Sequence, residues 1–233
     1  MRKFLFYTCI CATPFCSCVI AETPQPPIES PSLAKPFVAK DYANLIGMPG
    51  FSNDALSMHF KLYQGYVKTT NAFLSKLEEL RKSGNEFSLE FAEFKRRLMW
   101  DFDGMRLHED YFDNLGGYGT SLDPKSALYQ QMVVDFGSYD AWKSDFVATG
   151  AMRGIGWAIL YRDPLSGRLI NTWINEHDRG HLAGGNPILV MDVFEHAYLL
   201  DYGLDRKAYI DAFFNNINWP VVQTRYPGGN NGG

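Results

Sequence analysis

The sequence predicts an α+β fold, in which an N-terminal antiparallel helical hairpin domain precedes an α/β domain with a small three-stranded antiparallel sheet. Apolar residues recur at steps of three and four through two long segments between residues 52 and 112. Two apolar runs flank a turn between residues 156 and 174, and a third run follows at 188–193. With 233 residues, 46% of them hydrophobic, the chain can bury one large core or two smaller ones.

The first helix is expected to begin near Ser52 and Asp54, which can cap it, and to end at Gly84. A second helical pattern runs from about Leu89 to Phe112, and two antiparallel helices are the simplest arrangement. The first pattern consists of Leu56, His59, Phe60, Tyr63, Tyr66, Val67, Phe73, Leu74 and Leu77.

The pattern changes after the glycine-rich segment 116–119, where one or two further helices are expected between Pro124 and Ala151. The turn residues 163–167 separate two strands that should form a hairpin. The predicted strands are 156–162, 169–174 and 188–193, and the last predicted helices are 195–202 and 206–216.

The first 21 residues have the layout of a secretory signal peptide. Arg2 and Lys3 precede an uncharged stretch that ends in Val19-Ile20-Ala21. A membrane anchor is the main alternative, but Pro14 and the polar residues of this stretch make it a poor bilayer span. Lipid attachment at Cys18 is a weaker alternative. We therefore expect an exported protein, periplasmic or secreted, with no membrane contact after cleavage.

Five regions follow from these patterns. Prolines are frequent after residue 21, which is typical of an extended linker, and the chain ends in glycine and asparagine. The predicted regions are a signal peptide at 1–21, a proline-rich linker at 22–43, a helical N-terminal domain at 44–119, a C-terminal α+β domain at 120–226 and a flexible tail at 227–233.

Cleavage after Ala21 would remove every cysteine of the chain, since Cys9, Cys11, Cys16 and Cys18 all precede it. The mature protein then has no disulfide and no thiolate metal site. Cleavage also removes Arg2 and Lys3 but no acidic residue. The mature chain then has 20 basic and 26 acidic residues, which gives a formal charge of −6. A chain without a basic excess is a poor candidate for binding nucleic acid or anionic lipid.

Histidines and one aspartate are the candidates for chemistry. Asp192 ends a predicted strand, and His196 follows four residues later where the chain turns into a helix. His59 and His108 lie on the two long helices among aromatic residues, where an imidazole needs polar partners to offset its desolvation. Three imidazoles and one carboxylate could satisfy one another through a metal ion. This donor set favours iron, manganese or zinc over calcium or magnesium.

These residues resemble the iron/manganese superoxide dismutase family over nearly all of residues 44–226. The segment DVFEHAYLLDY, residues 192–202, is similar to the family's most specific signature, and GIGWAIL, residues 154–160, resembles its first strand with Trp157 in the aromatic position. The segments FGSYDAWKSDF and NNINWPVV also match. The resemblance implies one iron or manganese ion per subunit, held by His59, His108, Asp192 and His196.

The resemblance also implies roles around the metal. Tyr66 corresponds to a gateway tyrosine that hydrogen-bonds towards the metal-bound solvent, and Arg206 to a cation that lines the substrate funnel. Glu195 corresponds to a residue that pairs with His196 of the partner subunit, which implies a homodimer, with a tetramer as the alternative. His177 lies where some members carry a donor to the solvent ligand. The alternative for His177 is a plain loop histidine.

Gly104 stands where other members carry a donor in the first half of the protein, and its lack of a side chain leaves room for one from the second half. His181, in a glycine-rich loop, is interpreted as a surface residue. Three departures from the family pattern are a phenylalanine at 112 and 194 where tryptophan is usual, Tyr63 in place of a histidine in the proton path, and seven residues instead of eight between His59 and Tyr66.

The implied activity is dismutation of superoxide to dioxygen and hydrogen peroxide. Superoxide is an anion, so local cations such as Arg206 and Lys61 would have to offset the net negative charge. One alternative is a secreted metal-binding homologue of the same fold without turnover. Another is an iron oxygenase with two histidines and one carboxylate, which a fourth protein ligand disfavours.

Overall fold

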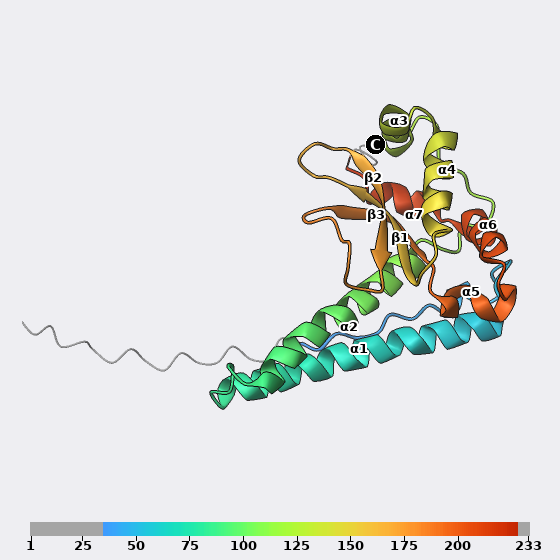
Figure 1. Cartoon of the computed structure of the whole chain (residues 1–233). Coiled ribbons are helices and arrows are strands. Elements are labelled where there is room, and N and C mark those ends of the chain that lie inside the picture. Colours follow the sequence, from blue (N-terminus) through green and yellow to red (C-terminus); the bar gives the residue numbers. More distant parts are fainter. Residues whose placement is uncertain (1–34, 228–233) are drawn as a thin grey trace, which may run out of the picture. The chain divides into compact units, whose positions relative to one another are not determined.

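A computed structural model of the chain describes residues 35–227. The predicted signal peptide, most of the predicted linker and most of the tail lie outside the described residues. Within them, the chain forms a pair of long helices, then a mixed region of helices and strands (Figure 1). The predicted α+β fold is confirmed. None of the described helices is long and apolar enough to cross a membrane.

The two long helices are α1, Asn53–Lys82, and α2, Leu89–Asp113, which lie side by side as an antiparallel pair (Figure 1). A serine caps each of them, because the side chain of Ser52 accepts from the backbone N–H of Ala55 and that of Ser88 does the same for Phe91. Helix α1 is α-helical throughout, without a π-bulge. The seven-residue spacing between His59 and Tyr66 therefore places both on one helical face.

The last part of the predicted linker packs against this hairpin instead of forming a free spacer. The backbone N–H of Phe37 donates to Asn71 Oδ1 at 2.9 Å, and Asn71 Nδ2 donates to the carbonyl of Phe37 at 2.8 Å. The N–H of Lys40 donates to the hydroxyl of Tyr63, and Tyr42 is buried. A short 3-10 helix, Ala43–Leu45, then leads into α1.

The sheet consists of β1, Gly156–Arg162, β2, Leu169–Asn175, and β3, Asn186–Asp192, with β1 in the middle and both pairings antiparallel. Trp157 pairs with Ile174 on one side and with Asp192 on the other. This register brings the end of β3 next to the buried Trp157. Asp192 therefore lies in the interior of the fold.

The remaining helices precede and follow the sheet in the chain. The helices α3, Ala127–Phe136, and α4, Tyr139–Gly150, precede it and pack together, and α4 also packs on β1 and β2. The helices α5, Glu195–Tyr202, and α6, Arg206–Asn216, follow the sheet as predicted, and α5 lies against α1. Helix α7, Trp219–Thr224, was not predicted from the sequence; its Pro220 lies in the first turn, where a proline is well tolerated.

Candidate metal centre

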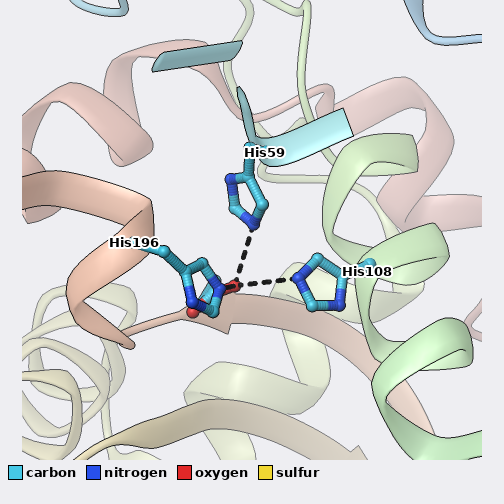
Figure 2. Close-up of side chains that lie close together, drawn as sticks. His59, His108 and His196 are labelled. Carbon is cyan, nitrogen blue, oxygen red and sulfur yellow. Dashed lines mark hydrogen bonds and ion pairs between the residues drawn. The ribbon is translucent and has the colours of Figure 1, made fainter. Parts of the chain in front are cut away.

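Four side chains from four different elements meet between the hairpin and the sheet. His59 comes from α1, His108 from α2, Asp192 from the end of β3 and His196 from the first turn of α5. Their candidate ligand atoms all lie within 4.8 Å of one another. Figure 2 shows the three imidazoles directed towards a common point. The structure thus brings together all four ligands that the sequence predicted.

The Asp192 carboxylate is the centre of this group. Its Oδ2 atom lies 3.2 Å from His59 Nε2, 3.1 Å from His196 Nε2 and 3.6 Å from His108 Nε2. Its Oδ1 atom accepts from the backbone N–H of Phe194 at 2.8 Å, and its backbone carbonyl accepts from the hydroxyl of Tyr209 at 2.5 Å. Both contacts hold Asp192 so that one oxygen faces the imidazoles.

His108 provides the clearest sign that the group fits a metal ion. Its Nδ1 lies 2.5 Å from the carbonyl of Gly104, which can only accept, so the proton is on Nδ1 and the lone pair is on Nε2. That Nε2 is fully buried and has no hydrogen-bond partner among the described residues. A buried nitrogen lone pair without a partner is costly, and a cation at the centre would satisfy it.

The electrostatics of the group are those of a ligand set. Burial lowers the pKa of His59 and of His108, so both are neutral at neutral pH. Burial opposes ionisation of Asp192, but its interactions with His196 and His59 outweigh this and hold the pKa of Asp192 below its usual range. Neutral imidazoles and an ionised carboxylate are the forms that bind a metal. Three nitrogens and one oxygen suit a transition metal better than calcium or magnesium.

Tyr66 and His177 form a hydrogen-bonded pair next to this group. The Tyr66 hydroxyl lies 2.8 Å from His177 Nε2, and the indole N–H of Trp157 donates to His177 Nδ1 at 3.1 Å. The ring of Tyr66 lies over Gly104, where an added Cβ would be 2.9 Å from a ring carbon. His177 is completely buried, so it is not a plain loop histidine.

Two other predicted site residues make different contacts. The buried Tyr63 donates its hydroxyl proton to Glu109 at 2.9 Å, and its ring stacks on that of His108. The guanidinium of Arg206 donates to the carbonyls of Met152 and Gly154 and to the hydroxyl of Tyr198. Neither side chain hydrogen-bonds a predicted metal ligand, and their catalytic roles stay predictions.

Two residues near the site escaped the sequence analysis. Trp100 lies with its ring centroid 4.4 Å from that of His177 and 5.8 Å from that of Tyr66, and its N–H donates to Glu176. The sequence signal for it was its position eight residues before His108, on α2. His181, interpreted as a surface residue, is partly exposed, and both of its ring nitrogens are hydrogen-bonded within the fold.

Comparison with known proteins agrees with this geometry. Residues 124–225 match the family model for the C-terminal domain of iron/manganese superoxide dismutases. An iron superoxide dismutase of Cupriavidus metallidurans is 40% identical over 183 residues, which cover 77% of this chain and 90% of that protein. The chain belongs to the iron/manganese superoxide dismutase family.

Relatives named for either metal match this family member about equally well. An iron superoxide dismutase of Aquifex pyrophilus is 39% identical over 194 residues, covering 80% of this chain and 89% of the relative. A manganese superoxide dismutase of Haloferax volcanii is 38% identical over 179 residues, covering 76% and 88%. Sequence similarity therefore does not distinguish iron from manganese here.

The two phenylalanines that depart from the family pattern both pack against the site of this superoxide dismutase family member. Phe194 stacks on His177 and on His196, with ring centroids 4.6 Å and 5.0 Å apart. Phe112 packs edge-on against His59 at 4.9 Å. Neither substitution removes a ligand, and both rings pack against the imidazoles.

The buried histidines predict that the metal-free protein loses stability as the pH falls from about 7 to 4. Burial lowers the pKa of His177 from 6.5 to about 4, so below 6.5 the unfolded chain binds this proton more readily than the folded one. The difference corresponds to about 3 kcal/mol of unfolding free energy at pH 4. Urea unfolding at several pH values should show that the unfolding free energy of His177→Gln declines less steeply with falling pH than that of the wild-type protein. Equal slopes for the two proteins would show that burial does not lower the pKa of His177.

Proposed function

We propose that this chain catalyses the dismutation of superoxide to dioxygen and hydrogen peroxide, using one iron or manganese ion held by His59, His108, Asp192 and His196. The observation that carries the proposal is the convergence of three imidazole Nε2 atoms on one Asp192 oxygen, with the buried Nε2 of His108 unpartnered. Membership of the superoxide dismutase family supports it. Held by these four residues, such an ion would supply the one-electron redox chemistry by which one superoxide is oxidised to dioxygen and a second is reduced to hydrogen peroxide.

The protein has to supply protons, because two protons are consumed for each pair of superoxide ions. Trp157 donates to Nδ1 of His177, so the His177 proton lies on Nε2 and is donated to the oxygen of Tyr66. The hydroxyl proton of Tyr66 is then free to point away from His177. Burial, followed by the charges of Asp192 and Asp101, raises the pKa of Tyr66, which keeps this hydroxyl protonated at neutral pH. Tyr66 is therefore suited to donate a hydrogen bond towards the metal position.

Access and charge support the same function. His59, His108 and Asp192 are buried, whereas the His196 side chain is 21% exposed, so the site lies just below the surface beside His196. Arg206 is the first residue of α6, and its guanidinium is held by the backbone carbonyls of Met152 and Gly154. We propose that this cation attracts the anionic substrate. The test is superoxide turnover of protein loaded separately with iron and with manganese. A fully loaded protein without turnover would favour the non-enzymatic homologue instead.

We further propose that the protein is exported and cleaved after Ala21. The supporting features are the basic Arg2-Lys3 start, the uncharged stretch up to Ala21 and the confinement of all four cysteines to residues 1–21. Mass spectrometry of protein from its natural host should give a mature chain that begins near Glu22, recovered from the periplasm or the medium. An intact N-terminus in the membrane fraction would favour an anchor instead.

The active protein is, in this proposal, a homodimer whose subunits meet at Glu195 and His196. Glu195 is exposed in the first turn of α5, and Leu199 and Leu200 are 48% and 57% exposed on the same helix. Burying this surface would pair Glu195 with His196 of the partner subunit. Light scattering should show a dimer that Glu195→Ala weakens and the exposed control Asp211→Ala does not. A fully active monomer would contradict the proposal.

A further inference from the structure

A second histidine holds the loop that carries His177. His181 lies in the connection between β2 and β3, and its Nε2 is 2.7 Å from the backbone carbonyl of His177. Its Nδ1 is 2.7 Å from the hydroxyl of Tyr161, on β1. We propose that His181 is a positioning residue that ties this loop to the sheet and thereby sets the place of the His177 ring. The inference rests on the proposed function, since His177 matters through that site.

The hydrogen-bond directions along this link follow from the groups involved. A carbonyl oxygen only accepts, so Nε2 of His181 carries a proton, and in the neutral ring Nδ1 carries the lone pair. The hydroxyl of Tyr161 must then donate to Nδ1. Burial, followed by the charges of Asp103 and Asp110, raises the pKa of Tyr161, so this donor keeps its proton. Because an amide carbonyl does not pass a proton on, the link positions His177 without relaying protons to it.

The backbone around His177 needs such support. Glu176 has φ = 54°, a left-handed conformation that is unfavourable for a residue other than glycine. Asn175 and Arg179 exchange backbone hydrogen bonds of 2.8 Å and 3.3 Å, so the chain reverses within five residues with His177 at its tip. Gly180 has φ = 108°, and an added Cβ would lie 2.7 Å from the carbonyl of Trp173. His181 follows directly and reaches back across the loop.

The link joins a residue of the sheet, Tyr161, to a loop outside the sheet. Tyr161 lies on the central strand and is almost fully buried, while the side chain of His181 is 30% exposed. Asp103 of α2 has an oxygen 3.7 Å from His181 Nε2, so a carboxylate also stands beside the ring. Without the imidazole, the carbonyl of His177 would lose its donor and the strained turn could relax.

A relaxed turn would affect the site mainly through His177. The His177 ring has to meet Trp157 on one side and the Tyr66 hydroxyl on the other, with bonds of 3.1 Å and 2.8 Å. A small shift of its backbone lengthens one of these bonds. His181 itself makes no hydrogen bond to a predicted metal ligand among the described residues. Its removal should therefore leave metal binding intact and lower turnover.

The test compares substitutions at one position in the metal-loaded enzyme. His181→Ala should keep its full metal content and lose turnover by roughly tenfold, since one neutral hydrogen bond contributes about 0.5–1.5 kcal/mol and tenfold in rate is 1.36 kcal/mol. His181→Gln should recover most of the rate, because its amide N–H lies near the place of Nε2 and can reach the carbonyl. His181→Asn is the matched control, since its shorter amide cannot reach that carbonyl and should not rescue.

Two further measurements separate positioning from a general structural effect. In a His177→Ala background, His181→Ala should cause no additional loss of turnover, whereas independent effects would add. Hydrogen exchange of the holoenzyme should become faster at the backbone amides of residues 175–179 in His181→Ala and less so in His181→Gln. The hydrogen-exchange measurement tests the role of His181 even if the wild-type protein proves to have no superoxide turnover.

The inference is overturned if His181→Ala has normal turnover, if its effect adds to that of His177→Ala, or if exchange in the loop is unchanged. Should His181→Ala fail to fold, Tyr161→Phe removes only the hydroxyl that bonds His181 Nδ1. That variant should change loop exchange and turnover in the same direction. Normal behaviour of Tyr161→Phe in both measurements would also refute the link.

Discussion

Replacing His196 by alanine is expected to abolish both metal binding and superoxide turnover. The substitution removes one of three imidazoles and leaves a cavity next to Asp192, whose Oδ2 lies 3.1 Å from His196 Nε2. Loss of an outer-shell partner already costs up to roughly 100-fold in metal affinity or activity, so loss of a direct ligand should cost more. The measurement is metal content by elemental analysis together with turnover on the same preparation.

Lys207→Ala is a suitable control, because the exposed ammonium of Lys207 pairs with Asp211 on the surface of α6, away from the metal ligands. This variant should retain metal and turnover. His196→Ala should also weaken the proposed dimer, which light scattering would detect. A His196→Ala protein with a full metal equivalent and normal rate would show that the ligand assignment is wrong.

Substitution of His177 by alanine should separate metal binding from catalysis. We expect nearly full metal content with turnover lowered by roughly 10- to 100-fold, as is usual when a hydrogen-bonding partner next to a metal site is removed. The physical reason is that the Tyr66 hydroxyl loses the donor 2.8 Å away and is no longer held in one orientation. The redox potential of the bound metal should change as well.

The outcome distinguishes three roles for His177. A metal ligand would lose metal together with rate, and a loop histidine would change neither. Tyr66→Phe provides a matched comparison, since it removes the other half of the same hydrogen bond and should also keep its metal. If His177→Ala has wild-type turnover and wild-type redox potential, the proposed hydrogen-bond path is wrong.

Local sequence patterns predicted the elements that place the site. The capping residues Ser52 and Asp54 predicted the start of α1, the three-to-four spacing of apolar residues predicted α1 and α2, and the turn at 163–167 predicted the β1–β2 hairpin. These features depend on neighbours within a few residues, so they can be read without the fold. The same holds for Asp192 and His196, which are four residues apart. The short helix α7, Trp219–Thr224, was not predicted.

Contacts between distant residues required the tertiary structure. His59 and Asp192 are 133 positions apart in the sequence, and the hydrogen-bonded residues Tyr66 and His177 are 111 positions apart. The family resemblance named these residues, but only the fold shows that His177 is buried between Tyr66 and Trp157. It also shows that the Tyr63 hydroxyl bonds Glu109.

The sequence by itself determined the α+β order of elements and the identity of the candidate ligands. Only the tertiary structure decided which way the loop histidines face. His181 lies in a glycine-rich loop without periodicity, so its neighbours in the chain do not specify its direction. That direction is set by the hydroxyl of Tyr161 on β1 and the carbonyl of His177. Long-range packing, which brings a strand and a loop together, is the physical reason.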